Sequence, residues 1–176
     1  GGKTTLMVQT ALKMAKHGKV VFVSGEMTAS QIVAVAVSHL GQVDMSPEAI
    51  RRRKTNQDAD SIARVKAGLE ALKTLPLYIV DHKAPSLADL NLYCQQYKPM
   101  LLVCDYLQIM KSPENAQNRE QEVAKNAQGL KSIAMEHDCA VMTGSQLNRD
   151  GQTRESDAPF HHCDVFMRIE PRDDNG

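Results

Sequence analysis

Five short, almost continuously apolar runs alternate with segments of helical periodicity along a chain of 176 residues. Runs of this kind are typical of strands that are buried on both faces, as in a parallel sheet. They comprise Val20 to Val23, Leu77 to Val80, Leu101 to Cys104, Cys139 to Met142, and Val165 to Ile169, which Arg168 interrupts. This alternation predicts an α/β fold, with a mostly parallel sheet and helices on both of its faces.

Two segments between the runs carry apolar side chains at intervals of three and four residues, which predicts amphipathic helices. The positions are Ile62, Val65, Leu69 and Leu72 in one segment, and Val123, Ala127, Leu130, Ile133 and Ala134 in the other. Helix start signals agree, because Thr28 and Ser86 stand where N-caps are expected and Pro47 follows Ser46 as a first-turn proline. In such folds ligands bind beyond the carboxyl ends of the strands.

Composition narrows the class of protein further. The chain is 42% hydrophobic and 24% charged, which is ordinary for a globular protein, and no apolar stretch approaches the length of about 18 residues that a membrane span needs. Its four cysteines show no CxxC spacing, which disfavours a zinc ribbon or a redox pair. Because the sequence shows neither a signal peptide nor a long apolar stretch, we expect a reduced, intracellular protein of the cytoplasm. The formal net charge is zero, so binding to nucleic acid would need a local basic patch.

Gly2-Lys3-Thr4 stands directly before a helical stretch and matches the end of the phosphate-binding loop G-x-x-x-x-G-K-[ST]. In that loop, backbone N–H groups and a helix N-terminus bind the phosphates, the lysine reaches the β and γ phosphates, and the hydroxyl binds Mg²⁺. The first glycine of the motif and the strand before it would lie upstream of Gly1. Taken alone, so short a match also fits a chance occurrence or the remnant of a tag.

Three polar side chains follow other apolar runs. Asp105 directly follows Leu101 to Cys104, as in a Walker B strand whose carboxylate holds the metal or its water. Glu26 comes shortly after the first run, where it could serve as the base for an attacking water, and Gln146 follows the fourth, where its amide could sense a γ-phosphate. Each also has an ordinary structural interpretation, as a turn aspartate, a first-turn glutamate and a polar loop residue.

Two further clusters have weaker functional interpretations. His161 to Asp164 suggests a metal site, but adjacent residues of an extended chain point to opposite faces, which favours structural histidines. Arg51 to Lys54 is a basic run of the kind that usually forms a solvated face. Aromatic residues make up only 4% of the chain and tryptophan is absent, so single-strand binding would depend on phosphate contacts rather than on base stacking.

Taken together, these motifs resemble the C-terminal, RecA-like motor domain of DnaB-type replicative helicases. The motifs that carry the resemblance are Gly2-Lys3-Thr4-Thr5, Phe22 to Met27 with Thr28 to Gln31, Leu75 to Ile79, Asp105 to Met110, Asn118 to Val123, and Ser145 to Arg149. They occur in the order found in that family and cover nearly the whole chain. The resemblance implies a RecA-like P-loop NTPase core, spanning residues 1–176 as a single motor domain that is truncated at both ends.

The resemblance also assigns roles to residues. It implies ATP and Mg²⁺ as ligands, a catalytic carboxylate at Glu26, and a γ-phosphate sensor at Gln146. The triphosphate would be bound by Gly2, Lys3, Thr4 and Thr5, with Lys3 also taking part in catalysis, and the Mg²⁺ ion by Thr4 and Asp105.

Arg154, Glu155 and Ser156 resemble an Arg-Glu-Ser-Gly segment that meets single-stranded DNA inside the ring of family members. Here Asp157 replaces the glycine, and the stretch before Arg154 is shorter than is usual in bacterial members, which favours a phage or prophage relative. The arginine finger of the family lies in a Lys-x-Arg segment near the end of the domain. No such segment follows Arg168, so no finger is assigned.

These features predict an ATP-dependent replicative DNA helicase motor. By resemblance it would form a homo-hexameric ring, hydrolyse ATP at subunit interfaces, and translocate 5′ to 3′ on single-stranded DNA, with primase and a helicase loader as partners and no membrane association. Two alternatives remain open at this point. One is a RadA-like or RecA-like recombination ATPase, and the other is a nucleotide-dependent assembly module without translocation.

Overall fold

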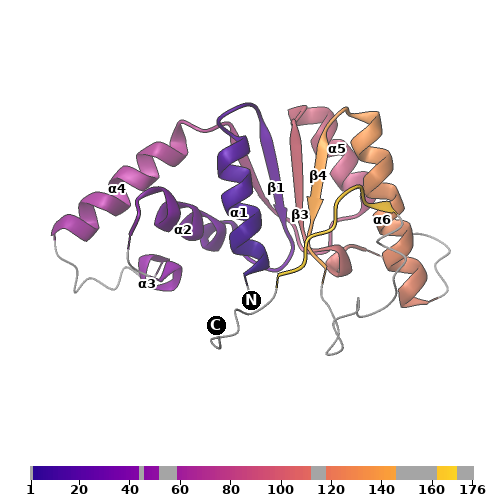
Figure 1. Cartoon of the computed structure of the whole chain (residues 1–176), viewed down its shortest axis with the longest axis horizontal. Coiled ribbons are helices and arrows are strands. Elements are labelled where there is room, and N and C mark those ends of the chain that lie inside the picture. Colours follow the sequence, from indigo (N-terminus) through magenta and orange to yellow (C-terminus); the bar gives the residue numbers. More distant parts are fainter. Residues whose placement is uncertain (1, 44–45, 52–58, 112–117, 146–161, 170–176) are drawn as a thin grey trace, which may run out of the picture.

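A four-stranded parallel sheet forms the centre of the chain, with the strand order β2-β1-β3-β4. The computed structural model describes residues 2–43, 46–51, 59–111, 118–145 and 162–169. The strands are β1 (Val20–Ser24), β2 (Leu77–Asp81), β3 (Leu101–Asp105) and β4 (Ala140–Thr143). All three neighbouring pairs are parallel, which confirms the α/β prediction for the fold (Figure 1).

Four of the five apolar runs form these strands. β1 and β3 are buried at every position because they lie in the middle of the sheet, whereas β2 and β4 flank them and are only partly buried. The prediction of a strand from Val165 to Ile169 is wrong, since these residues form no strand and Val165 is 76% exposed. A strand needs a neighbouring strand to satisfy its backbone hydrogen bonds, and the sheet formed by the described residues does not include this segment.

Six α-helices and one 3₁₀ helix are present among the described residues. They are α1 (Lys3–Met14), α2 (Ala29–Leu40), α3 (Pro47–Arg51), α4 (Ala59–Lys73), α5 (Leu87–Tyr97), η1 (Leu107–Ile109) and α6 (Arg119–Glu136). The predicted N-caps are confirmed: Thr28 forms a capping box with Gln31, and Ser86 forms one with Asp89. Within the described ranges, no helix combines the length and the apolar character that crossing a membrane requires.

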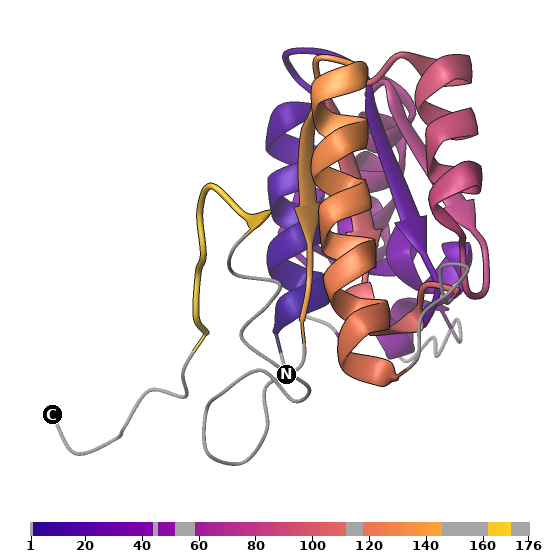
Figure 2. The same ribbon diagram turned by 90° about the vertical axis from the view of Figure 1, so that its right-hand side faces the viewer.

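The helices cover both faces of the sheet, as predicted (Figures 1 and 2). Alternate residues of β1 point to opposite faces: Val20 and Phe22 pack with α1 and α2, while Val21 and Val23 pack with α5 and α6. α4 packs mainly against α2, and Leu72 near its end packs against the core cluster on this face of the sheet. Its predicted apolar stripe is therefore only partly covered, and Leu69 remains 39% exposed.

Candidate functional site

The carboxyl ends of the strands bring several of the predicted site residues to one edge of the sheet. Because the strands are parallel and in register, Ser24 at the end of β1 pairs with Asp105 at the end of β3 and with Asp81 at the end of β2. α1 begins at this same edge, beside the end of β4 (Figure 1). The first turn of α1 therefore lies at the end of β3, and Thr4 contacts Asp105 there.

The N-terminus of α1 has the features of an anion-binding site. Gly2 is its N-cap and has a φ of 107°, a conformation that L side chains rarely adopt and that explains a glycine here. The first intrahelical hydrogen bond runs from Leu6 N–H to Gly2 O, so the N–H groups of residues 3 to 5 precede it. The first turn contains no acidic side chain. These N–H groups and the positive end of the helix dipole suit a phosphate.

Thr4 and Asp105 form the closest polar contact of the site. Thr4 Oγ1 donates a hydrogen bond of 2.7 Å to Asp105 Oδ2, and Asp105 is only 2% exposed. Burial raises the pKa of the Asp105 carboxyl, and the charge of Glu26 raises it further, whereas the Thr4 hydrogen bond and the Lys3 charge lower it. A buried carboxylate beside a hydroxyl at a phosphate-binding helix fits Mg²⁺, which prefers hard oxygen ligands.

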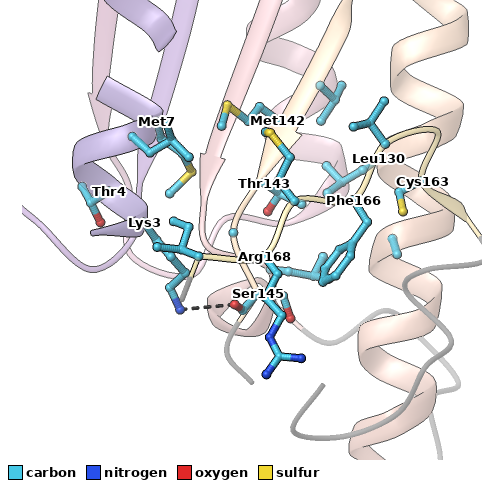
Figure 3. A pocket seen from close by; sticks show the side chains of 18 of the residues that line it. Lys3, Thr4, Met7, Leu130, Met142, Thr143, Ser145, Cys163, Phe166 and Arg168 are labelled. Atoms are coloured by element: carbon cyan, nitrogen blue, oxygen red, sulfur yellow. Dashed lines mark hydrogen bonds between the residues drawn. The ribbon is translucent and has the colours of Figure 1, made fainter. Parts of the chain in front are cut away.

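Lys3 extends from the first turn of α1 toward the segment that follows β4. Its Nζ donates a hydrogen bond of 3.3 Å to Ser145 O, and it lies 5.5 Å from the centroid of the Tyr106 ring, within the range of a cation–π interaction. Figure 3 shows Lys3 and Thr4 on one side of a cavity of about 850 Å³, with Phe166 and Arg168 on another. The ammonium group is thus held at the rim of a space large enough for a nucleotide.

Glu26 is exposed and lies in the turn between β1 and α2, where it lines the same cavity. Two hydrogen bonds shape this turn: Met27 N–H donates to Ser24 Oγ at 3.1 Å, and Gly25 N–H donates to Asp105 O at 3.0 Å. The second bond ties the turn directly to the end of β3. Glu26 is consequently close enough to Asp105 for its charge to raise the Asp105 pKa.

Three residues of the site were not predicted as functional. Tyr106 contributes its ring to Lys3, Ser145 contributes its carbonyl, and Gln108 Nε2 donates a hydrogen bond of 2.8 Å to Ser145 Oγ. All three lie within three residues of a strand end, and that position was the available signal. Which polar side chains after a strand face the site depends on the path of each loop, and the apolar pattern does not encode that path.

Other predicted residues lie at the margin of the site or outside the described residues. Thr5 is exposed in the first turn of α1 and lines the cavity. Outside the described residues lie the predicted sensor, the predicted DNA-binding residues, one histidine and most of the basic run: Gln146, Arg154, Glu155, Ser156, His161 and residues 52–54. His162 and Cys163 also line the cavity, and no group of three or more metal-ligating side chains occurs among the residues that the structure describes.

Comparison with known proteins supplies the family. The model of the family described as "DnaB-like helicase C terminal domain" matches residues 1–164. The chain belongs to this family. Membership confirms the resemblance seen in the motifs, and it favours the replicative helicase prediction over the recombination ATPase alternative.

Individual relatives agree with this assignment. A probable plasmid replicative DNA helicase of Chlamydia psittaci is 30% identical over 168 residues, and the replicative DNA helicase DnaB of Pasteurella multocida is 33% identical over 170 residues. The alignments cover 90% and 91% of this chain, but the chain spans only 35% of the length of each relative.

Solved structures show the same fold. One of them, the structure of an ATPase domain, superposes with a TM-score of 0.83 at 21% identity, covering 93% of this chain and 63% of that chain. A DnaB-like replicative helicase, solved in a study of its interactions with primase, superposes with a TM-score of 0.79 at 19% identity, covering 93% and 43%. The RecA-like ATPase fold predicted from the motifs is thereby confirmed.

Proposed function

We propose that this chain is the ATP-hydrolysing motor domain of a replicative DNA helicase. The observation that carries the proposal is the contact between Thr4 and the buried carboxylate of Asp105, formed at the start of a helix that offers N–H groups to an anion. Lys3 adds a positive charge at the same place. A phosphate-binding helix start, a lysine and a buried carboxylate are the elements that P-loop enzymes use to bind a nucleoside triphosphate with Mg²⁺.

Each residue has a distinct part in the proposed reaction. The N–H groups of α1 and the Lys3 ammonium bind and orient the phosphates, and Thr4 and Asp105 would hold Mg²⁺, which would neutralise charge on the triphosphate. Glu26 accepts a proton from the water that attacks the γ-phosphorus, and the products are ADP and inorganic phosphate. Gln146 would sense the γ-phosphate and relay its presence to the residues that follow. Positioning and electrostatic stabilisation supply most of the rate enhancement in this class of reaction.

The activity of the whole protein is proposed from its relatives. We expect a homo-hexameric ring in the cytoplasm with nucleotide at the subunit interfaces, moving 5′ to 3′ on single-stranded DNA. Arg154, Glu155 and Ser156 are the proposed DNA contacts, and primase and a helicase loader are the proposed partners. Because the net charge is zero, DNA binding by this chain alone should be weak and strongly dependent on salt.

A Glu26→Gln substitution in the native polypeptide that carries this chain tests the proposal. It keeps the size of the side chain and removes its basicity, so ATP hydrolysis should fall by at least about 100-fold. Binding of a fluorescent ATP analogue should change by less than about three-fold, because the residues that contact the phosphates remain. The matched control is Glu70→Gln, at an exposed position on α4, which should hydrolyse ATP at the wild-type rate.

Two outcomes would contradict the proposal. If Glu26→Gln still hydrolyses ATP, Glu26 is not the catalytic base. If the wild-type protein does not bind the analogue, the assignment of the nucleotide site is wrong. A slow wild-type hydrolysis that single-stranded DNA does not stimulate would favour the nucleotide-dependent assembly module.

A further inference from the structure

Gln108 occupies the middle of η1, three residues after Asp105, and its side chain bridges to another strand end. Its Nε2 donates a hydrogen bond of 2.8 Å to Ser145 Oγ, in the segment that follows β4. The carbonyl of the same Ser145 accepts the hydrogen bond from Lys3 Nζ. Ser145 is therefore held through its hydroxyl by Gln108, and through its carbonyl it contacts Lys3, the lysine of the nucleotide site.

The backbone of Gln108 makes a second connection, in the opposite direction. Its carbonyl oxygen accepts a hydrogen bond from Arg119 Nη2 in the first turn of α6, and Arg119 Nη1 also pairs with Glu122 Oε2 at 2.7 Å. Asn118 caps the same turn by accepting a hydrogen bond from Gln121 N–H. One residue thus connects the segment after β4 with the start of an 18-residue helix.

η1 itself is closely packed, so it can transmit a displacement rather than absorb it. Leu107 is 2% exposed, and its N–H donates to Gly144 O at 2.9 Å. Ile109 packs on Gly25 so tightly that a Cβ at Gly25 would lie 2.7 Å from Ile109 Cγ2. Gln108 is held between these two contacts. A shift of Ser145 relative to Lys3 should therefore move Gln108 and its neighbours together.

We infer that Gln108 is a positioning residue that couples the Lys3 end of the nucleotide site to the first turn of α6. The inference rests on the proposed function, because it assumes that Lys3 binds a nucleotide. An ammonium group has three donors, and one of them is used by Ser145 O. A phosphate bound at Lys3 accepts hydrogen bonds from the same ammonium group and so alters its hydrogen bond to Ser145 O. The change reaches α6 through the successive hydrogen bonds that join Lys3, Ser145, Gln108 and Arg119.

Gln108→Met is the variant that tests the coupling, since it keeps the length of the side chain and removes the amide donor. The measurement is hydrogen–deuterium exchange of the native polypeptide, with and without Mg·ATPγS at a saturating concentration. In the wild type, the nucleotide should slow exchange at the N-terminus of α1 and at residues 119–122. In Gln108→Met, the slowing at α1 should persist and the slowing at residues 119–122 should fall by at least about half.

Three further variants make the test specific. Gln96→Met changes the same residue type at an exposed position on α5 and should respond like the wild type. Ser145→Ala removes only the hydroxyl that accepts the hydrogen bond from Gln108, and it should repeat the effect of Gln108→Met. It therefore tests the coupling even if Gln108→Met folds poorly. Gln108→Glu can accept a hydrogen bond from the Ser145 hydroxyl, so it should restore most of the response at residues 119–122.

The results separate this inference from the function on which it rests. If the nucleotide slows no exchange at α1 in the wild type, the nucleotide site is wrong. The coupling role of Gln108 is wrong if the nucleotide slows exchange at α1 in all variants and slows exchange at residues 119–122 equally in wild type, Gln108→Met and Ser145→Ala. A Gln108→Glu variant that behaves like Gln108→Met would overturn the assignment to the Ser145 hydrogen bond.

Discussion

Replacing Thr4 with valine removes one hydroxyl and leaves the shape of the side chain nearly unchanged. In the folded chain that hydroxyl donates a 2.7 Å hydrogen bond to Asp105, which is 2% exposed, so the carboxylate loses a donor that water cannot easily replace. Hydrogen bonds to charged groups contribute about 1.5–3 kcal/mol. We therefore expect Thr4→Val to lower the free energy of unfolding by about 2 kcal/mol at neutral pH.

Urea unfolding in EDTA, followed by circular dichroism, measures this loss without a contribution from bound metal. Thr5→Val is the matched control, because Thr5 is exposed on the same turn, and its effect should stay within about 0.5 kcal/mol. In an Asp105→Asn background, Thr4→Val should cost less than about 1 kcal/mol, since the charged acceptor is gone. Equal losses for Thr4→Val and Thr5→Val, or equal losses for Thr4→Val in both backgrounds, would refute the reasoning.

The loss should also depend on pH in a defined direction. Burial raises the pKa of Asp105 in the folded chain, and the Thr4 hydrogen bond opposes that rise. The Asp105 carboxyl therefore keeps its proton to a higher pH in the folded chain than in the unfolded chain, and its contribution to stability falls as pH rises from the ordinary carboxyl pKa to the raised one. Removing Thr4 raises the folded pKa further, so the variant loses more stability over this interval. The difference in the free energy of unfolding between Thr4→Val and wild type should be small below this pH interval and constant above it.

Two other features, one contact and the burial of two thiols, can be checked directly. Tyr106→Leu should weaken ATP-analogue binding about two- to five-fold in a fluorescence titration because Lys3 loses its cation–π partner, and an equal effect of Tyr106→Phe would argue against the ring contact. Burial raises the pKa of both Cys94 and Cys104 to about 12, which makes these thiols unreactive in the folded chain. After maleimide treatment, peptide mapping should find the exposed Cys163 modified and Cys94 and Cys104 unmodified. In urea, which unfolds the chain, Cys94 and Cys104 should also be modified.

The apolar pattern predicted the centre of the sheet better than its surroundings. Val20 to Val23 and Leu101 to Cys104 become strands buried on both faces, and burial on both faces is what requires a continuous apolar run. Val165 to Ile169 has a similar composition but forms no strand, because strand formation depends on a hydrogen-bonding neighbour that composition does not specify. Local signals were sufficient for helix starts, as the capping boxes at Thr28 and Ser86 illustrate.

The site was predictable where a motif fixes both residue type and backbone position. Lys3 and Thr4 stand at a helix start and Asp105 stands at a strand end, and Thr4 contacts Asp105 because α1 begins at the carboxyl edge of the sheet. The bridge from Gln108 to Ser145 joins residues 37 positions apart through two loops. Its geometry depends on how η1 packs, and neither periodicity nor spacing determines that packing.

The nucleotide site can be tested most directly by a crystal structure of the native polypeptide with a non-hydrolysable ATP analogue and Mn²⁺ in place of Mg²⁺. The anomalous signal of Mn²⁺ should appear beside Thr4 Oγ1 on the side of the Asp105 carboxylate, with the phosphates against the N–H groups of residues 3 to 5 and Lys3 Nζ. A nucleotide bound elsewhere on the chain, or a Mn²⁺ signal remote from both Thr4 and Asp105, would contradict the assignment of these residues.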